Sequence, residues 1–185
     1  TTGIINKAVN LNGSSGIYTN ESEILNTFRG NGEWTIALFT DYHSPAYYTG
    51  YKYLFFAGSN TNAASAPKVL FQYDFNRNAQ VYRSQSSPAV NQSVYYSSIA
   101  KNIFMHIAAT FKDGVLNGYY NGSLLSSTSV DTDELTDDIN EFGLGYNVNT
   151  GNSGFWIGYL DLLYIYNRAL SSDEISMLYN GGAGM

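Results

Sequence analysis

Tyrosine side chains are concentrated in one short stretch of the chain, where their rings could stack on a sugar. Tyr47, Tyr48 and Tyr51 lie close together, and Asn60 and Asn62 follow in the next polar segment. An aromatic face can receive the apolar C–H face of a sugar, while short amide side chains bind its hydroxyl groups. The stretch also contains proline and glycine, which predict a loop. These five residues are therefore the first candidates for carbohydrate binding.

Two more aromatic residues, Tyr146 and Trp156, are added to this set. They lie on either side of the Gly- and Asn-rich segment 147–154, which is also predicted as a loop. For any single tyrosine, the simpler interpretation is a half-buried sheet residue whose hydroxyl group reaches water. The tyrosines of the first loop are least open to that interpretation, because their loop provides no sheet to pack in.

Catalysis makes demands that the sequence does not meet. A glycosidase places two carboxylates on one face of a cleft, which on a strand requires acidic residues at alternating positions. No predicted strand has this pattern, and the acidic segment 131–138 is predicted as a solvated loop. His106 is the only plausible ring base near the centre of a predicted strand. The sequence therefore predicts no catalytic residue, and a glucanase-like hydrolase or lyase is the least favoured alternative.

Composition excludes several classes of partner and site. The net charge is −6 without a basic cluster, so a nucleic-acid backbone is not an expected partner. No run of about 18 apolar residues is present, so insertion into a membrane is not expected. The chain has no cysteine, which rules out disulfides and thiolate metal sites. Its 185 residues are expected to form one domain, 1–185.

The segments that flank these loops, and that must position them, are predicted to be short strands. β-Branched and aromatic runs separated by Gly, Asn and Ser recur at the spacing typical of an antiparallel sandwich. Ser171 and Glu174 form a capping box, which predicts one short helix near 172–179. The expected fold class is therefore all-β, with two antiparallel sheets and a C-terminal helix. Strands are predicted at 8–11, 17–18, 33–40, 53–57, 69–75, 79–84, 103–111, 115–120, 123–127, 142–146 and 155–166.

Three segments resemble one known family. Residues 104–111 (FMHIAATF) and 119–122 (YYNG) form a predicted meander, and 165–171 (IYNRALS) precedes the capped helix. With the opening segment 8–14 (AVNLNGS), they resemble the concanavalin A-like jelly rolls, specifically the laminin-G-like (LamG type 3) branch of the lectin and glucanase folds. This resemblance spans nearly the whole chain, and it implies a two-sheet jelly roll. It also implies that His106, at the second histidine of the family's meander motif, is a structural residue packed under the sheet.

The resemblance also implies a function, a metal and a location. The implied function is a noncatalytic glycan-binding or adhesive module of an extracellular, cell-surface or virion protein. The competing interpretation is a structural domain of a phage or viral particle that packs against neighbouring protein subunits. The family often carries a structural calcium ion (Ca²⁺) between the first hairpin and the acidic residue of the last strand. Here those positions correspond to Asn12 and Asp161.

The last predicted strand has a phase conflict. Leu163 and Ile165 share one face of a regular strand, whereas Leu160 would lie on the opposite face. A strict period of two cannot bury all three, so the sequence predicts a bulge at Asp161 and Leu162. This bulge is expected to direct the Asp161 carboxylate toward the first hairpin.

Overall fold

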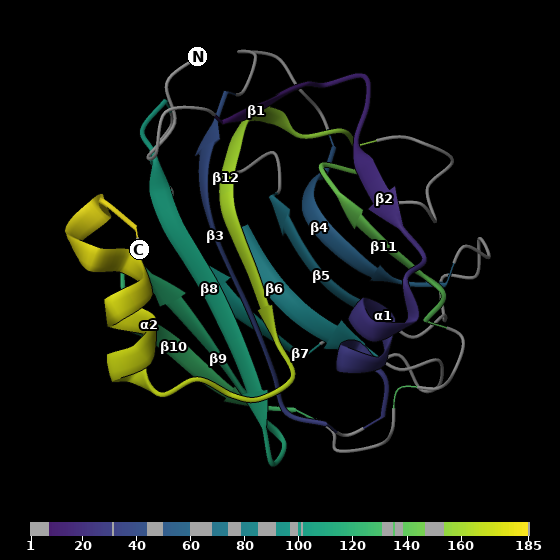
Figure 1. Ribbon diagram of the computed structural model, residues 1–185, viewed down its shortest axis with the longest axis vertical. Helices are drawn as coiled ribbons and strands as arrows, with labels where there is room; N and C mark the ends of the chain where they lie inside the picture. Colours follow the sequence, from purple (N-terminus) through teal and green to yellow (C-terminus); the bar gives the residue numbers. More distant parts are fainter. Residues whose placement is uncertain are drawn as a thin grey trace.

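The computed structural model describes residues 8–30, 32–43, 50–59, 68–73, 79–84, 92–96, 100, 102–130, 135, 139–146 and 154–184. These residues form two six-stranded antiparallel sheets that face each other (Figure 1). The first sheet has the order β1 (Val9–Asn12), β12 (Ile157–Tyr166), β3 (Trp34–Tyr42), β8 (Met105–Lys112), β9 (Val115–Tyr120), β10 (Ser123–Ser129). The second has the order β2 (Ile17–Thr19), β11 (Glu141–Leu144), β4 (Lys52–Gly58), β5 (Lys68–Tyr73), β6 (Ala79–Ser84), β7 (Gln92–Tyr96). The predicted two-sheet jelly-roll fold class is confirmed.

The main core lies between the two sheets and is rich in aromatic residues. Trp34, Phe71, Tyr96, Phe111 and Trp156 are each at most 1% exposed. Alternation along the strands produces this core, because every second side chain points to the same face of a sheet. The meander predicted at 103–127 is formed by β8, β9 and β10, with one shift of register between Leu124 and Ser126.

A second, smaller core lies on the outer face of the first sheet. There α2 (Ser172–Tyr179) packs across the sheet, as the yellow helix in Figure 1 shows. Its Ile175 and Leu178 are buried against Ala37, Ala108 and Tyr119 of the strands. The predicted capping box is present, since Ser171 Oγ accepts from Glu174 N and Glu174 Oε2 accepts from Ser171 N.

Two elements were not predicted from the sequence. The helix α1 (Ser22–Phe28) buries Leu25 and Phe28, three residues apart, which is too short a pattern to distinguish from a strand. The strand β7 follows a polar segment that masks its start. A short 3₁₀ turn, η2 (Asn180–Gly182), extends the end of α2. No helix in the described part of the chain has the length and apolar character needed to span a membrane.

The predicted first hairpin is wrong. Strands β1 and β2, expected to form a hairpin across the Asn-Gly turn, do not pair with each other. Instead β1 pairs with β12 in the first sheet, and β2 pairs with β11 in the second. The glycine-containing turn at 13–16 therefore carries the chain from one sheet to the other. A local Asn-Gly signal shows where a strand ends, but it does not show which strand becomes the next partner.

The predicted bulge in β12 is confirmed. The register against β3 shifts between Asp161 and Tyr164, and Leu162 has a φ of 49°. The extra residue lets Leu160 and Ile165 both face the main core, while Leu163 remains 39% exposed. The Asp161 carboxylate accepts a hydrogen bond from Leu162 N at 2.9 Å, so this contact lies within the bulge.

This contact leads to the first testable prediction. Replacing Asp161 by Ala removes the acceptor for the Leu162 amide, and we expect the free energy of unfolding to fall by about 1 kcal/mol. Urea denaturation measures the change. Glu21→Ala is the matched control, because Glu21 at the start of α1 makes no side-chain capping bond. Equal losses in the two variants would show that the bulge does not depend on the carboxylate.

Candidate functional site

Five aromatic side chains lie near one another over the outer side of the second sheet, at its β2–β11–β4 edge. We call this series the aromatic row, and its members come from four separate segments of the chain. The members are Tyr51, Tyr53, Phe155, Tyr146 and Tyr18.

Ring contacts form two of the four links in the row, and backbone pairing brings the other neighbours together. Tyr51 and Tyr53 lie 6.5 Å apart, and Tyr146 stacks on Phe155 at 5.9 Å with 21° between the planes. A parallel β-bridge joins Phe155 to Tyr53. Tyr18 pairs in register with Gly143, and the Tyr146 ring lies against that same glycine. Aromatic ring contacts each contribute about 0.5–1.5 kcal/mol beyond the area that they bury.

Two glycines make room for Tyr146. A Cβ atom added at Gly16 would lie 2.2 Å from a carbon of the Tyr146 ring, and one added at Gly143 would lie 3.1 Å from it. Any larger residue at Gly16 would displace the ring or the strand. The turn between β1 and β2 therefore helps to fix the position of Tyr146.

The Tyr146 hydroxyl group is held by an acidic side chain. It donates to Glu141 Oε1 at 2.9 Å. Burial, and then the neighbouring Glu141 carboxylate, raise the pKa of Tyr146 well above its ordinary value. The phenol thus stays protonated at physiological pH and acts as a fixed donor.

Exposure separates two roles within the row. Tyr51 is 48% exposed and Tyr18 is 68% exposed, so each offers a ring face to a ligand. Tyr146 is only 6% exposed and Tyr53 only 8%, so these two rings support their neighbours. The row therefore has exposed rings at both ends and a packed centre.

The residues that the sequence predicted for carbohydrate binding lie in different environments in the structure. Tyr51 and Tyr146 both belong to the aromatic row. The predicted binding role of Trp156 is corrected by the structure. Its side chain is fully buried between the sheets, where it contacts Tyr42, Phe71 and Tyr73. Its ring has no free face for a sugar. The remaining candidates, Tyr47, Tyr48, Asn60 and Asn62, lie outside the described residues.

The two predicted calcium ligands do not fit one shared site. Asn12 pairs with Ile157, whereas Asp161 lies four residues further along β12, a separation of about 13 Å along the strand. One ion requires each ligand oxygen within about 2.5 Å. The Asn12 side chain instead accepts hydrogen bonds from Ser14 N and Ser14 Oγ. Among the described residues, no three His, Asp or Glu side chains gather as a metal site. Calcium binding itself stays a prediction.

His106 is the structural residue that the sequence analysis expected. It is 0% exposed and lies beneath α2, with its ring 4.9 Å from Phe39 and 6.0 Å from Tyr179. Burial lowers the pKa of His106 to about 4. A ring in this position cannot reach a bound substrate.

Tyr18, Phe155 and Glu141 were not identified from the sequence. Tyr18 occupies a three-residue strand, and Phe155 precedes a strand in which it takes no part. A signal did exist at Gly143, where a glycine between Phe142 and Leu144 indicates close approach of another group. Only the fold shows that this group is a tyrosine ring.

Comparison with protein families gives one match. The model described as the concanavalin A-like lectin/glucanases superfamily, of laminin-G type 3, matches residues 11–176. A comparison with curated protein sequences gives no match.

Solved structures similar to this chain include carbohydrate-binding modules. The CBM40 of Ruminococcus gnavus IT-sialidase, bound to α2,3-sialyllactose, is 11% identical with a TM-score of 0.75, over 92% of this chain and 95% of that one. Domain 4 of AbnA, a GH43 extracellular arabinanase from Geobacillus stearothermophilus in complex with arabinotriose, is 22% identical with a TM-score of 0.68, over 95% and 78%. A leech intramolecular trans-sialidase is 16% identical with a TM-score of 0.74, over 91% of this chain and 26% of that one. At these identities the likeness shows the fold.

Proposed function

This chain belongs to the concanavalin A-like lectin/glucanase superfamily, and from that premise we propose that it is a noncatalytic carbohydrate-binding module. The observation that carries the proposal is the aromatic row, in which Tyr51 and Tyr18 present accessible rings on one side of the second sheet. Structurally similar modules, in complex with sialyllactose and with arabinotriose, support the ligand class. The module would belong to an extracellular, cell-surface or virion protein.

The chemistry of the row suits binding. Ring faces of Tyr51 and Tyr18 can stack on the apolar faces of sugars, and their hydroxyl groups can bind sugar hydroxyls. The proposal contains no catalytic step. Glu141, the acid that contacts the row, accepts a hydrogen bond from Tyr146.

The second testable prediction concerns Tyr51. Replacing Tyr51 by Ala removes an accessible ring at one end of the row, and we expect glycan binding to weaken about tenfold, or about 1.4 kcal/mol. A glycan array, run in calcium and in EDTA, measures the loss. Tyr95→Ala is the matched control, because Tyr95 is 61% exposed and lies on β7, at the far edge of the same sheet. Equal binding by the two variants would place the site elsewhere.

A structural role is the second candidate, and one surface favours it. Where the edges of the two sheets meet, a largely apolar pocket of about 160 Å³ is lined by Val9, Ile17, Leu144, Leu160, Asp161, Leu162 and Leu163. Val9 and Ile17 are 48% and 46% exposed. Apolar surface of this kind suits contact with a neighbouring protein subunit. A stable oligomer by light scattering, together with an empty glycan array, would favour this role over carbohydrate binding.

A further inference from the structure

A second cluster of aromatic and polar side chains lies on the outer face of the first sheet. We call it the Tyr159 platform, and it consists of Asn10, Asp41, His43, Phe104 and Tyr159. Tyr159 pairs in register with Asn10 on one side and with Asp41 on the other. Phe104 directly precedes Met105, the register partner of Thr40, so it lies opposite Asp41 on the neighbouring strand.

Alternation shows that these side chains point away from the main core. Their neighbours Leu11, Tyr42, Met105 and Leu160 all belong to the core between the sheets. Because successive side chains on a strand point to opposite faces, the platform residues face outward. The last residue of α2, Tyr179, stacks on Phe39 at 6.3 Å. The platform begins two residues further along β3, beyond that contact.

The rings of the platform are arranged in a fixed geometry. Phe104 and Tyr159 lie nearly parallel, with 21° between their planes and 6.3 Å between their centroids. The His43 ring meets Tyr159 edge-on at 5.3 Å and 90°. The side chain of His43 is 38% exposed, and Asn10 is exposed beside it. Phe104 and Tyr159 are themselves partly exposed. Two aligned rings with an imidazole and an amide at their edges form a partly exposed, amphipathic surface.

Asp41 holds the imidazole in place. Its side chain is only 9% exposed, and Oδ1 lies 2.8 Å from His43 Nε2. This close contact keeps the imidazole beside Asp41, at the edge of the Tyr159 ring. The Asp41 backbone is fixed as well, since its carbonyl oxygen accepts from Trp156 Nε1 at 3.4 Å. Asp41 is therefore a positioning residue, and His43 is the group offered to the ligand.

We propose that the Tyr159 platform is a second carbohydrate-binding surface, specific for neutral oligosaccharides. Tyr159 and Phe104 would stack on sugar rings, while His43 and Asn10 would bind hydroxyl groups. The inference takes its ligand class from the proposed function. It differs in location, because the aromatic row lies on the second sheet and the platform on the outer face of the first.

Charge selects neutral sugars over anionic ones. The described outward residues at this end of the first sheet include the carboxylates of Asp41 and Asp161 and a single imidazole, that of His43. An acidic sugar would approach these carboxylates in a chain whose net charge is −6. Like charges brought close together disfavour such a complex. Sialylated glycans should therefore depend on the platform less than neutral ones.

The test compares four variants on one array of neutral and sialylated oligosaccharides. We expect Tyr159→Ala and His43→Ala to weaken the binding of neutral glycans about tenfold, a change equivalent to about 1.4 kcal/mol. Tyr51→Ala reports on the aromatic row, and Tyr95→Ala is the exposed-tyrosine control. Circular dichroism verifies that each variant is folded. For Asp41→Ala, nuclear Overhauser contacts between the His43 and Tyr159 rings should weaken while the rest of the spectrum stays unchanged, which a general loss of folding would not cause.

The outcomes are distinct. If Tyr159→Ala loses the binding of neutral glycans and Tyr95→Ala retains it, the platform is supported as a binding surface. Unchanged binding by Tyr159→Ala and His43→Ala, with a loss on Tyr51→Ala, would overturn the platform and leave the proposed function intact. A wild-type protein that binds no glycan would overturn both.

Discussion

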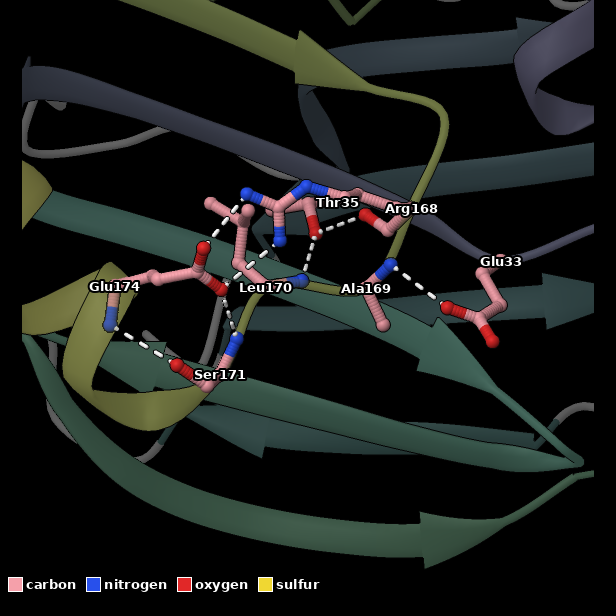
Figure 2. A network of polar contacts seen from close by, with 7 residues as sticks. All are labelled: Glu33, Thr35, Arg168, Ala169, Leu170, Ser171 and Glu174. Atoms are coloured by element: carbon pink, nitrogen blue, oxygen red, sulfur yellow. Dashed lines mark hydrogen bonds and ion pairs between the residues drawn. The ribbon is translucent and has the colours of Figure 1, made fainter.

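Replacing Thr35 by Val is expected to lower the free energy of unfolding by about 2–5 kcal/mol. Thr35 lies on the outer face of β3 and is fully buried. Its Oγ1 donates to Arg168 O at 2.8 Å and accepts from Leu170 N at 2.9 Å (Figure 2). Valine keeps the shape but leaves both backbone groups without a partner. A fully buried unsatisfied group, such as Leu170 N, costs about 1–3 kcal/mol, and the partly buried Arg168 O costs less than the upper value.

The neighbouring contacts cannot replace this hydroxyl group. Ala169 N donates to Glu33 Oε2 at 3.3 Å, and Arg168 forms a two-point ion pair with Glu174. Figure 2 shows that these contacts surround Thr35 while satisfying other groups. The Arg168–Glu174 pair lies near the surface, where water screens it, so it contributes little. Thr35 is therefore the main polar link between β3 and the segment that leads into α2.

Urea denaturation measures the loss in the free energy of unfolding, and two variants serve as controls. Thr35→Ser keeps the hydroxyl group and should retain most of the stability. Thr128→Val makes the same change on the edge strand β10, where the hydroxyl has only a weak contact at 3.5 Å. A loss on Thr35→Val no larger than that on Thr128→Val would contradict the assignment.

Acid is expected to destabilise the fold through His106. The folded pKa is lowered from 6.5 to about 4 by burial, so the folded state favours the neutral ring. Neither ring nitrogen has a hydrogen-bond partner within the part of the chain that the structure describes. A proton on this ring would therefore be a buried charge without compensation.

The direction of the effect follows from linkage. Between pH 6.5 and about 4 the unfolded chain binds a proton at His106 that the folded chain does not. The contribution of the neutral ring is thus fully present above pH 6.5 and is lost as the pH falls toward 4. The shift corresponds to a loss of about 3 kcal/mol.

His106→Phe tests this prediction, because phenylalanine cannot take up a proton. We expect the stability of wild type to fall more steeply than that of the variant between pH 6.5 and 4, by about 3 kcal/mol in total. His43→Gln, a change in a half-exposed histidine, should retain the steep fall. Parallel stability–pH curves for wild type and His106→Phe would show that His106 does not cause it. His106→Leu provides a second test if the larger ring of phenylalanine overpacks the site.

Much of the fold could be predicted because its signals are local. The capping box of Ser171 and Glu174 is formed by residues three apart, so no distant contact is needed to specify it. The bulge at Leu162 followed from a conflict of phase within one strand. The burial of His106 agreed with its position in a β-branched and aromatic run.

The residues of the aromatic row were predictable only in part. Tyr51 was recognised because its loop offers no sheet to pack in, and exposure confirms that its ring is accessible. Trp156 was misassigned because an aromatic residue beside a Gly-rich loop has the same local pattern whether it points inward or outward. Tyr18 was overlooked because its three-residue strand has no periodicity to measure.

The sequence by itself determined most of the strands, their alternation, the capped helix and the family, since each depends on residues close together in the chain. Only the tertiary structure decided which strands pair, and hence that β1 and β2 belong to different sheets. That pairing separates Asn12 from Asp161, and it assembles the aromatic row and the Tyr159 platform from distant segments. The physical reason is that strand pairing is set by the packing of the whole core, in which the correct partner is chosen against all the others.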